Sequence, residues 1–254
     1  MKVAVILRQV PDVVEELVIA EDGKHLSEDD VMYTTNEWDD HALEQALILK
    51  ERHGHRVTAI AVGGSEAKDA LATTIAKGAD EAIFVPVEFQ ARGDNHKLAA
   101  LLAPMLRDGG YNIVMTGMQA ADQIDGGLGS ILASHLKLPS AGGITSVGVT
   151  PGGGLLLKKE YPGGRIGVME IAVPAFIDIQ SAEQPPRYVP VSKVMQARKT
   201  MQVKEMKLAV PDITGTRITQ LMKPEAGARA KMLEGDEEKV AAGIATILKE
   251  RGLL

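Results

Sequence analysis

The chain has 254 residues and a formal net charge of −6, with 45% hydrophobic and 24% charged residues. This length allows one large domain with an extension or two modest domains, and either can bury a core. The absence of cysteine excludes disulfides, thiolate zinc sites and iron–sulfur clusters held by this chain. The negative charge argues against general nucleic-acid binding.

No apolar run approaches the roughly 20 residues that a membrane span requires. The apolar opening at residues 2–7 is too short, and followed too soon by Arg8, for a secretory signal. We therefore expect a soluble cytoplasmic protein that neither inserts into a membrane nor binds nucleic acid.

Short β-rich runs alternate with helical patterns over the first two thirds of the chain. The predicted strands are 2–7, 57–62, 81–85 and 112–116. The predicted helices are 39–52, 65–77, 94–107 and 127–136, with Asn36 and Ser65 as N-caps of the first two. This alternation predicts a Rossmann-like α/β fold, in which a mostly parallel sheet is flanked by helices.

After Pro139 the hydrophobic period changes from 3.6 to 2. Predicted strands at 144–149, 155–161 and 166–171 are separated by glycine clusters typical of hairpin turns, and 175–179 completes the sheet. These segments predict antiparallel hairpins added to the parallel sheet.

The last part of the chain has a different character. A Lys- and Met-rich stretch without a clear period precedes a predicted helix at 237–250. We predict a nucleotide-binding α/β domain at 1–183, and an extended C-terminal arm with a terminal helix at 184–254. With few bulky apolar side chains, such an arm buries little surface by itself, so we expect it to lie on the main domain or on a partner subunit.

The turn from Thr116 to Gly129 is the best candidate for a ligand site, because open parallel sheets bind ligands beyond the carboxyl ends of their strands. Its glycines let the backbone approach an anion, and they precede a helix whose N-terminal amides attract phosphate. Asp122 and Asp125 would face ribose hydroxyls or cap the helix, since phosphate would repel them. The same spacing also fits an ordinary strand-to-helix turn, and the spacing leaves both interpretations open.

Recognisable catalytic motifs are missing. The chain has neither G-x-x-x-x-G-K-[ST] nor G-x-G-x-x-G, its six histidines lack metal-ligand spacing, and no local Ser, His and acid arrangement can be assembled. We therefore predict no metal site and no catalytic residues. Trp38 fits two roles, a packed or staple side chain at a helix start, or a ring that lines a cofactor pocket.

Several motifs, taken in order, are similar to one known family. They are Arg8-Gln9-Val10-Pro11-Asp12, Asn36-Glu37-Trp38-Asp39 with the helix that follows, Ala76-Lys77-Gly78-Ala79-Asp80, Gly117-Met118-Gln119-Ala120-Ala121-Asp122, and Pro186-Arg187-Tyr188 with Met195-Gln196-Ala197-Arg198-Lys199 downstream. Over nearly its whole length the chain resembles the β subunit of electron transfer flavoprotein.

The resemblance implies a heterodimer with an α subunit that carries electrons from flavin-dependent dehydrogenases to a downstream acceptor. It implies an FAD held mainly by the α subunit and an AMP buried in this chain, with Val13 and Trp38 approaching the flavin edge. The cofactor contacts that it implies are Ile6, Asn36, Glu37, Trp38, Asp39, Gly63, Gly117, Met118, Gln119, Ala120, Ala121, Asp122, Gln123, Ile124, Asp125, Gly126, Gly127 and Leu128.

The implied partner-binding residues are Arg187, Tyr188, Val191 and Met195. In the family this segment anchors on acyl-CoA dehydrogenases through a leucine, where this chain has the shorter Val191. A lost methylene predicts docking weaker by about 1 kcal/mol, which leaves a different dehydrogenase as an alternative partner.

The nucleotide loop departs from the family as well. Gly126, Gly127 and Leu128 supply no side-chain donors, so backbone amides would have to hold the phosphate. Two alternatives to the AMP-binding carrier stay open. One is an electron-bifurcating type with a second FAD in this cavity, and the other is a stand-alone adenine-nucleotide sensor or hydrolase.

Overall fold

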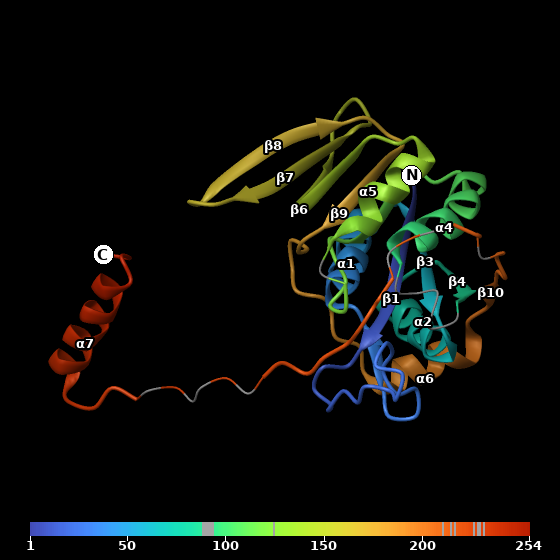
Figure 1. Ribbon diagram of the computed structural model, residues 1–254. Coiled ribbons are helices and arrows are strands. Elements are labelled where there is room, and N and C mark those ends of the chain that lie inside the picture. The colour runs from blue at the N-terminus through green and yellow to red at the C-terminus, as the bar shows by residue number, and fades with distance from the viewer. Residues whose placement is uncertain are drawn as a thin grey trace. The chain divides into compact units, whose positions relative to one another are not determined.

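The computed structural model describes residues 1–87, 94–123, 125–209, 211–213, 215, 217–225, 227, 230 and 232–254. The chain divides into two compact units, Met1–Gln220 and Leu221–Leu254, which are described separately. In the first unit, the described residues form a 10-stranded sheet in the order β10-β4-β3-β1-β5-β9-β6-β7-β8, with β2 paired to β1 (Figure 1).

The parallel part of the sheet confirms the predicted α/β class. Its strands are β1 (Lys2–Pro11), β3 (Arg56–Gly63), β4 (Glu81–Pro86), β5 (Ile113–Gly117) and β9 (Ala175–Ile179). β1 runs beyond its predicted end because residues 9–11 pair antiparallel with the short β2 (Tyr33–Thr35), which the sequence did not predict.

Both faces of these strands are covered, which is why their sequences read as continuous apolar runs. Val3, Val5 and Leu7 of β1 join the core beneath α1 (Glu37–His53) and α2 (Ser65–Lys77). Ala4 and Ile6 face the opposite core, beneath α4 (Asn95–Gly109) and α5 (Gly127–Leu136).

The helix caps differ in part from the prediction. Asp94 caps α4 with its carboxylate, accepting hydrogen bonds from the amides of His96 and Lys97. Ser65 is not a cap, because α2 begins at Ser65 after Gly64, and the Glu66 side chain accepts from the Gly64 amide instead.

The predicted hairpins are confirmed at β6 (Ser140–Val149), β7 (Leu155–Tyr161) and β8 (Arg165–Ile171), which pair antiparallel in turn. β9 then returns between β5 and β6 and lies parallel to both. β6 carries an irregularity between Ala141 and Ile144, and this leaves Gly142 and Gly143 outside the regular register.

The first compact unit continues past residue 183. The predicted arm contains α6 (Val191–Thr200), which packs on α2, and β10 (Val203–Glu205), which adds a parallel edge strand to β4. The sequence did not predict these two elements. The assignment of residues 184–254 to partner binding, and of residues 1–183 to nucleotide binding, stays a proposal.

The second unit contains the predicted terminal helix, α7 (Glu237–Glu250), whose N-cap Asp236 accepts from the Lys239 amide. No residue of α7 is buried. Among the described residues, no helix combines the length and apolar character needed to cross a membrane.

Candidate functional site

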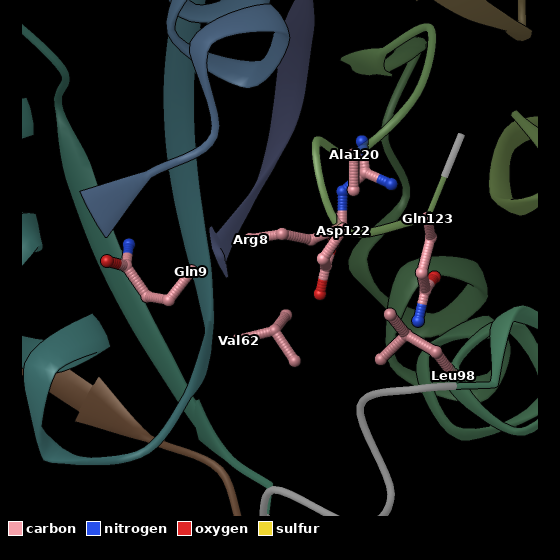
Figure 2. A pocket seen from close by; sticks show the side chains of 7 residues that line it. All are labelled: Arg8, Gln9, Val62, Leu98, Ala120, Asp122 and Gln123. Carbon is pink, nitrogen blue, oxygen red and sulfur yellow. The ribbon is translucent and has the colours of Figure 1, made fainter. Parts of the chain in front are cut away.

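The candidate site lies where β1, β3 and β5 end, at the carboxyl edge of the parallel sheet. A hollow enclosing about 300 Å³ of empty space, open solvent included, is lined by Arg8, Gln9, Val62, Leu98, Ala120, Asp122 and Gln123. In Figure 2, Ala120, Asp122 and Gln123 lie on one side of the hollow and Gln9 on the other, with Arg8 and Val62 between them. The predicted loop therefore does face a concave surface.

One buried carboxylate holds the edge together. Asp39 is 0% exposed and accepts five hydrogen bonds. Three come from Arg8, through its amide at 2.8 Å, Nε at 3.0 Å and Nη2 at 2.9 Å. The others come from the Thr116 hydroxyl at 3.1 Å and the Gly117 amide at 2.7 Å. Asp39 thus joins the start of α1 to the ends of β1 and β5.

Arg8 is only 7% exposed, so its charge needs this partner. Burial opposes the charged form, but the surrounding carboxylates, with Asp39 contributing most, together hold the pKa of the guanidinium above its ordinary value. Its Nη2 also donates to the Gly117 carbonyl at 3.1 Å. The result is a fixed cation beside the hollow whose hydrogen-bonding groups are largely committed to the protein.

Asn36 anchors the nucleotide loop. It is the N-cap of α1 by position, but its side chain makes no capping bond. Instead Nδ2 donates to the Gln119 carbonyl at 2.8 Å, and Oδ1 accepts from the Ala121 amide at 3.2 Å. This pair of bonds fixes the loop against β1 and α1.

Position 117 must be glycine, because the start of α1 lies too close to it to leave room for a Cβ. A Cβ at this position would overlap the backbone and Cβ of Trp38 and lie 2.6 Å from the Asp39 nitrogen. The start of α1 therefore lies directly on the end of β5. The backbone and Cβ of the half-buried Trp38 form this contact, and a cofactor role for its ring stays a prediction.

Asp125 lies just before α5 and binds its first amide, which is one of the two roles that the sequence suggested for this residue. Its Oδ1 accepts from Asn95 Nδ2 at 2.8 Å and from the Gly127 amide at 3.3 Å. Gly126 precedes the helix in the left-handed conformation, at φ 62°. Asp125 thus takes up the first amide of α5, and the amides of a helix's first turn are groups that commonly bind an anion.

The remaining predicted cofactor residues are spread over the same edge. Ile6, Gly63 and Leu128 are buried, while Glu37, Ala121 and Asp122 are exposed and Met118 is half-buried. Ile124 lies outside the described residues.

The predicted cofactor contacts did not include Arg8, Gln9, Val62 and Leu98, which line the hollow, or Asn95, which bonds to Asp125. A charged and an amide side chain following an apolar strand were the available signal for Arg8 and Gln9.

The predicted partner-binding residues separate into two kinds. Arg187 is held within the chain by its bonds to Glu44, at 3.1, 3.0 and 2.7 Å, and to Glu51 at 2.6 Å. Tyr188, Val191 and Met195 are exposed by 85%, 70% and 49%. Arg187 therefore fastens the segment to α1, and the three apolar side chains face outwards.

Among the described residues, no group of three or more His, Asp or Glu side chains gathers closely enough to hold a metal ion. The chemistry that this edge offers is binding by fixed amides, one cation and a concave surface.

Comparison with known proteins identifies the family. The family model described as electron transfer flavoprotein domain matches residues 24–211. The electron transfer flavoprotein subunit beta of Methylophilus methylotrophus is 31% identical, with 98% of each chain covered. The subunit beta of Bacillus subtilis is 27% identical, with 98% of each chain covered. The Caffeyl-CoA reductase-Etf complex subunit CarD of Acetobacterium woodii is 26% identical over 100% of both chains. The chain thus belongs to the electron transfer flavoprotein β-subunit family.

Proposed function

We propose that this chain works as the β subunit of a heterodimeric electron transfer flavoprotein, which passes electrons from a flavin-dependent dehydrogenase to a downstream acceptor. Family membership over nearly the whole chain supports the electron-transfer role. The observation that carries the proposal is the rigid carboxyl edge, where Asp39 joins α1, β1 and β5 beside a hollow.

The ligand proposed for this chain is AMP. The Asn36-anchored loop, the amides of the α5 first turn and the Arg8 charge together suit a nucleotide with one phosphate. Side chains in this region are already bonded to one another, so backbone groups would make most phosphate contacts. Such an AMP stabilises the folded chain by mass action and takes no part in electron transfer.

The redox group proposed is one FAD, held mainly by the α subunit, with this chain forming one wall of the flavin site. Val13 is 73% exposed and stands beyond the end of β1, where a second subunit can reach it. We propose that this chain contributes no catalytic residue, in line with the absence of catalytic motifs in its sequence.

The proposed dehydrogenase-docking surface is formed by Tyr188, Val191 and Met195. Their exposure supports this role, because exposed apolar side chains close together commonly mark a protein contact. Arg187 then acts as the anchor that presents them. We propose that the complex operates in the cytoplasm.

The test is reconstitution with the cognate α subunit, followed by mass spectrometry of the small molecules released on denaturation. We expect one AMP and one FAD per heterodimer, and reduction of that FAD by a flavin-dependent dehydrogenase. Two FAD and no AMP would favour the bifurcating type instead. Nucleotide turnover by the isolated chain, without dimer formation, would refute the carrier proposal in favour of a sensor or hydrolase.

A further inference from the structure

A second carboxyl is buried at the carboxyl edge, and the network around Asp39 does not use it. Asp178 lies near the end of β9, in a strand whose other residues are apolar, and it is 6% exposed. It stands directly opposite Thr116 of β5 and beside the irregularity in β6. Burying an acid at such a position favours its neutral form unless the charge is paired and hydrogen-bonded.

Two glycines make room for this carboxyl. A Cβ at Gly129, in the first turn of α5, would overlap the Asp178 carboxylate oxygens. A Cβ at Gly142 of β6 would lie 3.3 Å from Oδ2. The Asp178 side chain is therefore aimed at the first turn of α5, the same turn whose amides are proposed to hold the phosphate.

Asp178 Oδ1 has no hydrogen-bond partner among the described residues. The α5 first turn, Thr116 of β5 and Gly142 of β6 bring no charge to it. The charged groups nearby are Arg8 of β1 and Asp39 of α1, while Lys159 of β7 lies beyond Gly143 and Asp125 caps α5. Burial raises the pKa of the Asp178 carboxyl to about 7, against the attraction of Arg8 and with the repulsion of Asp39.

We propose that Asp178 is a specificity-determining residue of the nucleotide site, and that its carboxyl must be in the neutral acid form when a nucleotide phosphate lies at the first turn of α5. The inference rests on the proposed AMP site. A neutral carboxyl there offers an O–H donor next to the phosphate, whereas a carboxylate repels it. Phosphate binding is therefore coupled to uptake of one proton by Asp178.

The coupling has a defined sign. Well below pH 7 the carboxyl is already mostly neutral, so AMP binds with little proton uptake by Asp178. Above pH 7 each binding event must take up a proton, so the affinity falls with rising pH. With a free-state pKa of about 7, AMP should bind about 20-fold more weakly at pH 8.5 than at pH 6.5. The second ionisation of a phosphate monoester, near pH about 6, is nearly complete over this range and contributes little.

The experiment measures AMP and adenosine affinity from pH 6.5 to 8.5 for the nucleotide-free complex of this chain with its α subunit. Asp178→Asn keeps the shape and a neutral donor, so its AMP affinity should be independent of pH and should exceed that of the wild type at pH 8.5. Glu170→Gln, which removes an exposed carboxylate from β8, is the matched control and should keep the wild-type pH profile. Adenosine should bind with no pH dependence, because it carries no phosphate.

Calorimetry of the wild type in buffers of different ionisation enthalpy gives a second readout that needs no variant. AMP binding should take up about one proton at pH 8.5 and almost no net proton at pH 6.5. The inference is overturned if Asp178→Asn retains the pH dependence, if adenosine shows the same dependence, or if no proton is taken up at pH 8.5. AMP binding would survive each of those results. Failure of the wild type to bind AMP at any pH would instead overturn the proposed nucleotide site, and this inference with it.

Discussion

Replacement of Asp39 by asparagine tests whether one carboxylate holds the carboxyl edge of the sheet. Asparagine keeps the size of the side chain but removes the charge that balances Arg8. It also turns one acceptor into a donor that faces the donors of Arg8 and Gly117. Asp39 is 0% and Arg8 7% exposed, so neither group can recover its bonds from water.

Breaking one side of a buried ion pair costs about 3–5 kcal/mol, and we expect Asp39→Asn to fall in that range. The matched control is Glu37→Gln, which neutralises an exposed acid in the same helical turn and should cost less than about 0.5 kcal/mol. The assay is urea unfolding of the wild type and both variants. A loss of that size should lower the midpoint by about 1–2 M without changing the slope.

The double variant Arg8→Met with Asp39→Asn separates the ion pair from the other bonds of Asp39. Because the unpaired guanidinium is then gone, the double variant should be more stable than the sum of the single losses predicts, by about 2–3 kcal/mol. Equal losses for Asp39→Asn and Glu37→Gln, or strictly additive losses in the double variant, would refute the reasoning.

Three further substitutions test other parts of the unit. Gly117→Ala should cost about 1–3 kcal/mol and weaken nucleotide binding, because its Cβ would overlap Trp38; unfolding and AMP titration measure the two effects. Burial lowers the pKa of His55 to about 4 from an ordinary value near 6.5. The unfolded chain therefore binds a proton that the folded chain refuses, so stability should fall as pH drops from about 6.5 to 4, and His55→Asn should reduce that fall in urea midpoints. Arg187→Met leaves the buried Glu44 without its partner and should cost about 1–3 kcal/mol, with faster proteolysis of the segment around α6.

Each of these substitutions has a control or a contrary outcome. Gly148→Ala places a Cβ at ordinary contact distance, 3.8 Å from its nearest neighbour, and should change stability little. Identical pH profiles for the wild type and His55→Asn would exclude the histidine as the source of acid sensitivity. Arg198→Gln removes an exposed ion pair with Asp69 and should cost less than about 1 kcal/mol. If it accelerates proteolysis as much as Arg187→Met does, the anchoring role of Arg187 is wrong.

Local patterns were sufficient for most of the fold. The 3.6 and 2 periods located α1, α2, α4, α5 and the main strands within a few residues, because each of these elements buries a stripe or face of regular spacing. The same period located α7, although none of its residues is buried. The sequence did not predict α6, because its ten residues are too few and too polar to show a clear helical period. The strands β2 and β10 are too short for a period of 2 to stand out, and each exists because an edge was available for pairing.

The sequence by itself determined the α/β class, the glycine-rich loop that opens α5, and the family. Tertiary structure alone decided how the site is held, because its bonds join residues far apart in the chain. Asp39 reaches Gly117, Asn36 reaches Ala121, and Asp178 fills the space left by Gly129. Parallel strands bring their carboxyl ends to one edge through long crossovers, so no local period records which side chains meet there.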